Sequence, residues 1–214
     1  VLKIDPAPRM LPYNPRREEA RIQERAAGIS RATGVLYVDD TVLLAEWADG
    51  EVWTRNHFGE DDNLRHLAHA LRDVHGLPPT GRVFDLRAAA RQYARQLNAA
   101  DLRDAESHLG LIESMPGPTN LCCCHNDLVA ENIITTPRVR FLDWEYACDN
   151  DPLFDLAVVV AHHGLCDRQA RVLLDAYFDG DGSPWREQLA TQMRLYDALY
   201  RLWAGANASP AQDE

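Results

Sequence analysis

Three polar side chains in the second half of the chain have the types and spacing to carry chemistry. Asp127 is followed by Asn132 in "HNDLVAEN", and Asp143 stands in "FLDWEYA" after the next apolar run. If the runs between them form a hairpin, these side chains can converge at one of its ends. Asn132 and Asp143 offer the oxygen ligands that suit Mg²⁺, which leaves Asp127 to receive or orient a hydroxyl proton. Phosphoryl transfer needs this division of labour.

Two short strands must position these residues, and we expect them at residues 132–136 and 138–144, joined around Pro137. The adjacent cysteines at 122–124 are expected in or near a buried strand that precedes His125. A zinc site in "CCCH" is not favoured, because tetrahedral sites use separated pairs such as C-x₂-C. Each of the three polar residues could alone belong to a turn, but their joint spacing favours catalysis.

The N-terminal quarter of the chain predicts a small α+β unit that ends near Trp47. A short apolar run occupies residues 1–4, and several prolines then delay regular structure. Residues 16–29 have the composition of a helix, and residues 35–47 contain two apolar runs split by two aspartates, as in a hairpin. The rest of the chain is expected to be mostly helical. Helical patterns occupy residues 63–76, 84–97, 155–164, 167–178 and 184–205.

The composition excludes several classes of function. Hydrophobic residues make up 46% of the 214 residues, which is enough for a packed core, and the net charge is -11. An acidic body repels nucleic acid and attracts a cationic small molecule. No apolar run approaches the roughly 20 residues of a membrane span. Of the five cysteines, three are adjacent, which indicates reduced thiols and a cytoplasmic location.

The two motifs together resemble those of a known family. "HNDLVAEN" fits H-x-D-x-x-x-x-N, and "FLDWEYA" followed by "DPLFDLA" fits the segment that comes next in kinase-like phosphotransferases. The chain resembles the choline/ethanolamine kinase and aminoglycoside phosphotransferase superfamily over nearly its whole length. The resemblance implies an α+β, protein-kinase-like fold of two lobes. It also implies an ATP-dependent phosphotransferase that uses Mg²⁺ and acts on the hydroxyl of a small alcohol.

The resemblance also implies a role for each matching position. Asp127 would be the catalytic base, Asn132 and Asp143 the metal ligands, and His125 and Asp155 structural supports. The remaining positions would bind the nucleotide. Lys3 would contact the phosphates and pair with Glu19 or, as a second choice, with Glu18. The backbone of Glu46 and Ala48 would bind adenine.

The N-terminal lobe departs from the family pattern. Members have two strands and a phosphate-covering loop before the strand that bears the lysine, whereas nothing precedes Val1 here. We therefore expect a fragment with a truncated N-terminal lobe at residues 1–47 and a helical C-terminal lobe at residues 48–214. Such a chain could be inactive as it stands.

The substrate side of the site contains aromatic residues that suit a cation. "DWEYA" resembles the choline-kinase form of the motif, in which Tyr146 would line an amine pocket, and Tyr200 and Trp203 lie on one face of the last predicted helix. Packing of Trp203 and Tyr200 into the core is an equal alternative. Glu145 could serve the metal, the ammonium group or neither. Choline or ethanolamine is favoured; a thiamine or aminoglycoside kinase is the alternative, and the oligomeric state stays open.

Three other classes of protein are alternatives. A non-catalytic nucleotide-binding pseudoenzyme gains support from the missing phosphate loop, but an intact Asp127 argues against it. A protein kinase would carry D-F-G and A-P-E, and neither is present. A structural metal-binding protein would be built around the cysteines of "CCCH". The sequence leaves the role of Cys122, Cys123 and Cys124 open.

Overall fold

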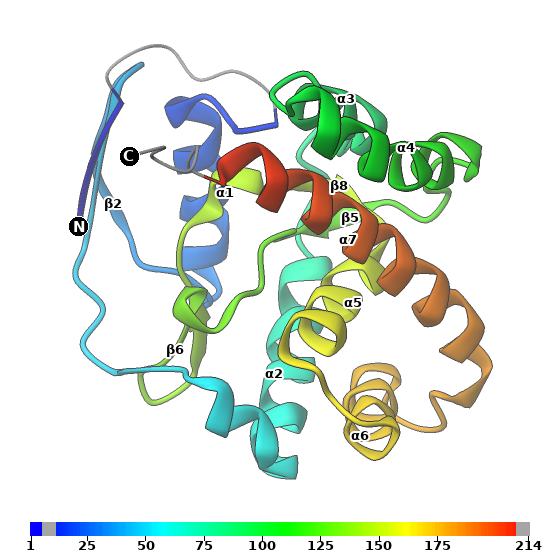
Figure 1. Cartoon of the computed structure of the whole chain (residues 1–214). Helices are drawn as coiled ribbons and strands as arrows, with labels where there is room; N and C mark the ends of the chain where they lie inside the picture. The colour runs from blue at the N-terminus through cyan, green and yellow to red at the C-terminus, as the bar shows by residue number, and fades with distance from the viewer. Residues whose placement is uncertain (6–11, 209–214) are drawn as a thin grey trace.

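The computed structural model describes residues 1–5 and 12–208 of the chain. Figure 1 shows the first sheet and helix α1 on one side of the molecule and the later helices on the other. No helix within those two described ranges is long and apolar enough to cross a membrane.

The N-terminal unit is a three-stranded antiparallel sheet with one helix. Strands β1 (Leu2–Ile4), β2 (Val35–Val38) and β3 (Val42–Ala45) run in the order β1-β3-β2, and α1 (Arg16–Gly28) follows β1 in the chain. The turn between β2 and β3 is held by Asp39, whose Oδ1 accepts backbone N–H groups at 2.8 and 2.7 Å. The hairpin and the helix expected from the sequence are both present.

Two further sheets surround the predicted site. Strands β4 (Glu51–Val52), β6 (Ile133–Thr135) and β7 (Val139–Phe141) form an antiparallel sheet in the order β4-β6-β7. Strand β5 (Cys122–Cys124) pairs with β8 (Cys148–Asn150). The β6–β7 hairpin and the buried cysteine strand match the sequence prediction, whereas the β5–β8 pairing was not foreseen.

Helices make up most of the remaining chain. In chain order these elements are η1 (Arg55–Gly59), α2 (Asp61–His75), α3 (Leu86–Ala94), α4 (Ala99–Ser114), η2 (Ala130–Asn132), η3 (Trp144–Tyr146), α5 (Pro152–His163), α6 (Asp167–Phe178), η4 (Ser183–Trp185) and α7 (Arg186–Asn207). Helix α5 packs against α7, and α2 packs against α6. The boundaries of α5 follow local rules, because Asp151 caps the first turn by accepting from the Leu153 N–H at 2.9 Å, and Gly164 ends it with a φ of 63°.

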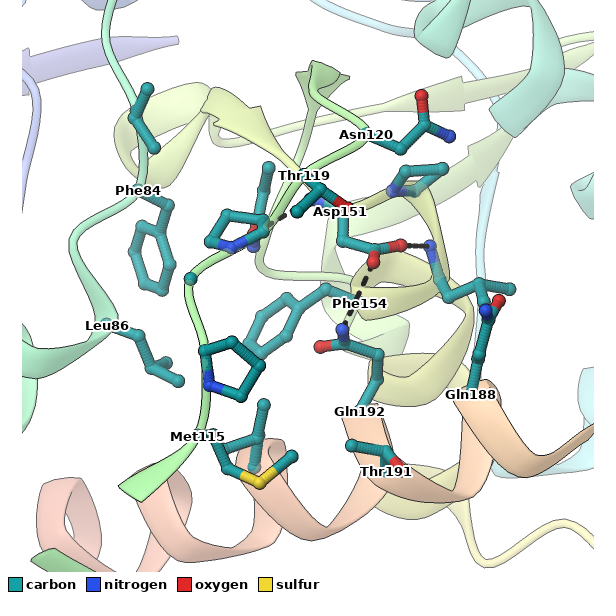
Figure 2. A pocket seen from close by; sticks show the side chains of 18 of the residues that line it. Phe84, Leu86, Met115, Thr119, Asn120, Asp151, Phe154, Gln188, Thr191 and Gln192 are labelled. Atoms are coloured by element: carbon teal, nitrogen blue, oxygen red, sulfur yellow. Dashed lines mark hydrogen bonds between the residues drawn. The ribbon is translucent and has the colours of Figure 1, made fainter. Parts of the chain in front are cut away.

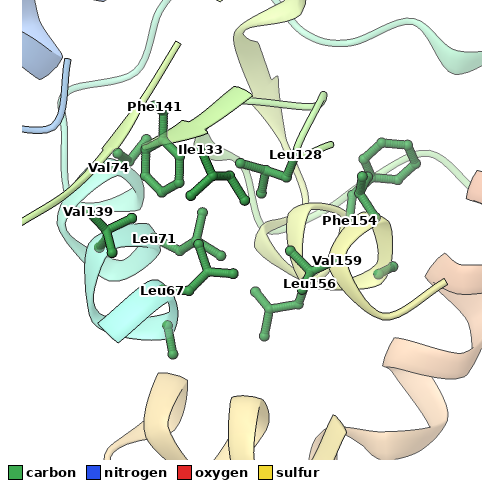
Figure 3. Close-up of a cluster of buried hydrophobic side chains, with 14 of the residues drawn as sticks. Leu67, Leu71, Val74, Leu128, Ile133, Val139, Phe141, Phe154, Leu156 and Val159 are labelled. Carbon is green, nitrogen blue, oxygen red and sulfur yellow. The ribbon is translucent and has the colours of Figure 1, made fainter. Parts of the chain in front are cut away.

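The main core attaches the site hairpin to the helices. On α2, Leu67, Leu71 and Val74 recur at helical spacing, and all three are fully buried. Figure 3 shows these side chains facing Ile133 of the hairpin and Val159 of α5. Each such side chain contributes about 1.5–3 kcal/mol by leaving water. This packing holds the end of the hairpin, and the polar residues that follow it, in a fixed position.

Candidate active site

The loop between β5 and β6, here called the Asp127 loop (residues 125–132), brings Asp127 and Asn132 together. The Asn132 Nδ2 group donates to the backbone oxygen of Asp127 and to its Oδ2, both at 2.9 Å. These two bonds fix the carboxamide and consume its donors. The Oδ1 oxygen of Asn132 is therefore the atom that remains for a metal.

Asp143 follows β7 and completes the group. Its backbone is left-handed, with φ 60° and ψ 74°, a conformation that costs a non-glycine residue of order 1–3 kcal/mol and clusters at functional sites. Its Oδ1 lies 2.5 Å from Lys3 Nζ, and its charge acts on the Asp127 carboxyl. The three side chains on which the sequence analysis depends thus face one region.

Lys3 joins the first sheet to this region. Its Nζ lies 2.6 Å from Glu19 Oε1 on α1, in addition to its contact with Asp143. Glu19 is fully buried, and its Oε2 also accepts from Arg16 Nη1 at 2.6 Å. Two cations therefore compensate one buried carboxylate, which would otherwise be strongly disfavoured. Glu18, the second choice from the sequence, instead pairs with Arg21 on the surface of the helix.

Asp155 and His125 hold the Asp127 loop through buried hydrogen bonds. The Asp155 carboxylate is fully buried and accepts the backbone N–H groups of His125 at 2.8 Å and Asn126 at 2.7 Å. It also lies 3.0 Å from Nε2 of His75, a partner that the sequence analysis missed. The His125 ring contacts the Leu142 carbonyl through Nε2 at 2.9 Å, and burial lowers its pKa. Both residues are thus buried and hydrogen-bonded at the loop, and their role as structural supports stays a prediction.

The electrostatics of the loop favour a proton acceptor. The pKa of Asp127 is raised from 3.8 to about 7, chiefly by burial and then by the negative charges of Asp143 and Glu145. The hydrogen bond from Asn132 lowers the pKa and offsets part of this rise. A general base acts best when its pKa lies near the working pH. Asp127 is therefore suited to take a proton from a hydroxyl group at neutral pH.

Aromatic residues from three parts of the chain gather near Asp127 and Glu145, whose charges act on Tyr93. The Tyr146 and Tyr13 rings lie 4.9 Å apart, and Tyr146 is also hydrogen-bonded to Tyr93 of α3. Asn14 secures this arrangement, because its Nδ2 donates to the Ala147 carbonyl at 2.7 Å. Tyr13 and Tyr93 were not identified from the sequence. Neither lies in a motif, and only the folded chain brings them to Tyr146.

The predicted pair on the last helix forms a stack. Tyr200 and Trp203 have ring centroids 5.6 Å apart, and Tyr196 lies 5.9 Å from Tyr200. Tyr200 is 39% exposed and Trp203 37%. The buried face of α7 is instead formed by residues such as Leu202. Each ring is therefore partly covered and partly open to solvent, and the role of the pair in substrate binding or packing stays a prediction.

This stack approaches the Asp127 loop through Tyr196. Burial raises the pKa of Tyr196, and the charges of Asp127 and Tyr200 raise it further. The hydroxyl of Tyr196 also bonds to Nδ1 of His162 on α5 at 2.7 Å. Tyr196 was not among the site residues predicted from the sequence.

The positions expected to bind adenine lie just after β3. The Glu46 N–H donates to the Gly34 carbonyl at 2.9 Å, and its carboxylate accepts from the Gly34 N–H at 3.1 Å. Ala48 follows Trp47, whose side chain is 78% exposed. The backbone of Glu46 and Ala48 is thus placed at the end of the first sheet, and its contact with adenine stays a prediction.

The donor set fits a hard divalent cation. Asn132 Oδ1 and the Asp143 carboxylate are oxygen ligands, and Mg²⁺ takes only one or two protein carboxylates when phosphates and water supply the rest. In the present structure Lys3 neutralises Asp143. Binding a metal at Asp143 would require Lys3 to exchange that carboxylate for another anion, such as a nucleotide phosphate.

A large cavity lies elsewhere. It has a volume of about 1000 Å³ and is lined by aromatic residues such as Phe84 and Phe154 and by the Asp151 carboxylate, which accepts from Gln192 Nε2 at 3.2 Å (Figure 2). None of the predicted site residues lines it. Its size alone therefore does not identify it as the place of phosphoryl transfer.

Comparison with known proteins identifies the family of the chain. The model of the phosphotransferase enzyme family (APH) matches residues 6–196. Protein LicA of Haemophilus influenzae is 30% identical over 166 residues, which are 72% of this chain and 62% of that protein. A thiamine kinase of Salmonella heidelberg is 41% identical over 63 residues, 29% of this chain and 22% of that protein. The chain thus spans less than two thirds of the length of these relatives.

A solved structure supports the fold. The structure of a choline/ethanolamine kinase family protein from Mesorhizobium loti is 28% identical, with a TM-score of 0.74 over 99% of this chain and 76% of that one. The predicted α+β, kinase-like fold is therefore confirmed. The family match covers most of the chain, and the solved relative has the same fold over nearly all of it. This chain belongs to the phosphotransferase enzyme family.

Proposed function

We propose that the protein transfers the γ-phosphoryl group of ATP to the hydroxyl of a small cationic alcohol of the choline or ethanolamine type. The observation that carries the proposal is the convergence of Asp127, Asn132 and Asp143 beside the Lys3–Glu19 pair. Family membership supports the reaction class. The division into lobes at residues 1–47 and 48–214 and the cytoplasmic location remain part of this proposal.

The proposed mechanism assigns one task to each side chain. Asp127, with its pKa near 7, accepts the proton of the substrate hydroxyl as the oxygen attacks phosphorus. Lys3 leaves Asp143 and neutralises phosphate oxygens, while Glu19 keeps its side chain directed to the site. When bound by Asn132 and Asp143, Mg²⁺ would offset negative charge on the phosphates. Positioning and charge stabilisation supply most of the acceleration.

The aromatic residues around Asp127 support a cationic substrate. The faces of Tyr146, Tyr200 and Trp203 would attract an ammonium group, each contact contributing about 0.5–2 kcal/mol. Glu145 acts on Asp127 electrostatically and would add a negative charge beside the cation. The net charge of -11 would concentrate cations near the protein. A small amine alcohol fits these features better than a neutral sugar.

Two alternatives differ from this proposal in their acceptor. Thiamine carries a quaternary nitrogen and a primary alcohol, so the same aromatic residues would suit it, and the local similarity to a thiamine kinase favours it. An aminoglycoside would need several carboxylates around an open cleft. A pseudoenzyme would bind nucleotide through Lys3 and Glu19 without transfer.

An acceptor panel tests the proposal. The chain would be incubated with ATP, Mg²⁺ and choline, ethanolamine, thiamine or an aminoglycoside, with ADP release and the phosphorylated product both measured. We expect choline or ethanolamine to give the highest kcat/KM and Asp127→Asn to abolish product. Thiamine as the best acceptor would replace the substrate assignment. Nucleotide binding without product from any acceptor, in a chain extended to the length of its relatives, would favour the pseudoenzyme.

A further inference from the structure

A second polar cluster lies next to Asp155, the residue that accepts hydrogen bonds from the Asp127 loop. His75 at the end of α2 and Cys122 and Cys124 on β5 each offer one ligand atom, and these atoms all lie within 4.8 Å of one another. The two sulfurs are 3.6 Å apart, because residues two apart on a strand point to the same face. The cluster is sheltered, since Cys124 is fully buried and the His75 side chain is only 5% exposed.

The hydrogen bonds of His75 indicate which ring nitrogen carries the lone pair. Asp155 can only accept, so His75 Nε2, 3.0 Å away, carries the ring proton. His75 Nδ1 then has the lone pair, and it accepts from the Tyr177 hydroxyl at 2.7 Å. This hydroxyl must turn away before Nδ1 can bind a metal. The charges of both thiols act on Tyr177, which places that hydroxyl beside them. A carboxylate that holds the far nitrogen of a histidine ligand is the usual support of a protein metal site.

We propose that His75 Nδ1 and the thiolates of Cys122 and Cys124 form a Zn²⁺ site. Tetrahedral zinc with bonds of about 2.3 Å to sulfur separates two sulfurs by about 3.8 Å, close to the separation of Cys122 and Cys124. Two thiolates and one neutral imidazole balance the charge of the ion, which suits a buried position. A water molecule completes the tetrahedron.

The large cavity lies close to the cluster. Its lining includes Tyr177 and Asp151, and the Asp151 carbonyl lies 3.7 Å from Cys124 Sγ. None of the three proposed ligand residues lines this cavity, so metal uptake requires a local opening next to Asp151 and Tyr177. Binding exchanges protons for metal. Each of the two S–H bonds breaks as a Zn–S bond forms, two protons leave to solvent, and no electron is transferred.

Adjacent cysteines provide matched controls. Cys123 lies on the same strand with its side chain on the opposite face, and Cys166 is exposed at the start of α6. Neither belongs to the cluster. Cys122 is only half-buried, so Cys122→Ser removes a ligand with little disturbance of packing. His75→Ala is a poorer test, because it also removes a partner of Asp155.

The experiment is a Co²⁺ titration of the reduced chain, followed by displacement with Zn²⁺. We expect thiolate-to-cobalt charge-transfer absorption and tetrahedral visible bands that saturate at one ion per chain, with two protons released for each Zn²⁺ bound. Cys122→Ser should weaken affinity on the order of tenfold or more, whereas Cys123→Ser and Cys166→Ser should retain the bands. Absence of thiolate bands in the parent, or their persistence unchanged in Cys122→Ser, would overturn the proposal. Loss of the bands in Cys166→Ser would do the same.

Discussion

Replacing Asp127 with asparagine should make the protein more stable at alkaline pH while removing its activity. The pKa of this carboxyl is raised to about 7, first by burial and then by Asp143 and Glu145. A raised pKa means that the folded protein holds the proton more tightly than the unfolded chain. The stability of the parent therefore falls as the pH rises from about 4 to about 7. The stability of the Asp127→Asn variant does not fall in this way, because asparagine does not ionise.

The size of the effect follows from the shift. Each pKa unit corresponds to about 1.36 kcal/mol, so a rise from 3.8 to about 7 gives about 4 kcal/mol above neutral pH. At about pH 5.5 only about half of this difference has developed. The side chain is half-buried and keeps some contact with water, which lowers both values. We expect Asp127→Asn to be about 2–4 kcal/mol more stable at pH 8 and to lose about half of that advantage at pH 5.5.

Urea unfolding of parent and variant at the two pH values measures this difference. Asp39→Asn is a control of opposite sign, because backbone hydrogen bonds from Thr41 and Val42 lower the pKa of Asp39. Its stabilising effect is present above the unfolded pKa and is lost as the pH falls. Asp39→Asn should therefore be the less stable protein at pH 8. An Asp127→Asn variant that is destabilised equally at both pH values would refute the argument from burial and like charge.

Three further outcomes are expected. The kcat/KM of the parent should rise with pH through about 7, because the deprotonated Asp127 is the active form, and a flat profile between pH 5.5 and 8.5 would contradict this. Lys3→Met should raise KM for ATP and also lower the stability of the protein. The loss should be smaller than the roughly 3–5 kcal/mol that follows when a buried charge loses its partner, because Arg16 still pairs with Glu19. Trp203→Ala should raise KM for the amine about 2- to 30-fold with little change in Tm. Leu202→Ala, the buried control, should cost about 2–5 kcal/mol of stability and leave that KM unchanged. A Trp203→Ala variant that loses stability without a change in KM would make Trp203 a packing residue.

Local patterns allowed much of the fold to be predicted. The apolar spacing of α2, the split runs of the β2–β3 hairpin and the strands at β6 and β7 each follow from a few neighbouring residues. Family motifs then indicated the Asp127 loop. The pairing of β5 with β8 was missed, because three residues on each side carry too little pattern to specify a partner.

Contacts between distant residues could not be predicted in the same way. Lys3 and Asp143 are 140 residues apart, and no local feature of either one specifies the ion pair. In the sequence, His75 has the pattern of a polar residue at the end of an amphipathic helix. In the structure, its side chain contacts Asp155, which holds the Asp127 loop. Tyr93 likewise has the spacing of an ordinary helix residue. In each case the partner is chosen by packing of whole elements, which sequence periodicity does not encode.

The central claim is that Asn132 and Asp143 hold the metal of a bound nucleotide while Lys3 contacts its phosphates. A crystal structure with Mn²⁺ and ADP, with Mn²⁺ located by anomalous scattering, tests this most directly. The account predicts Mn²⁺ bound to Asn132 Oδ1 and the Asp143 carboxylate, with Lys3 moved from Asp143 to a phosphate oxygen. A metal bound elsewhere, with Lys3 still paired to Asp143 and the nucleotide on another face, would contradict it.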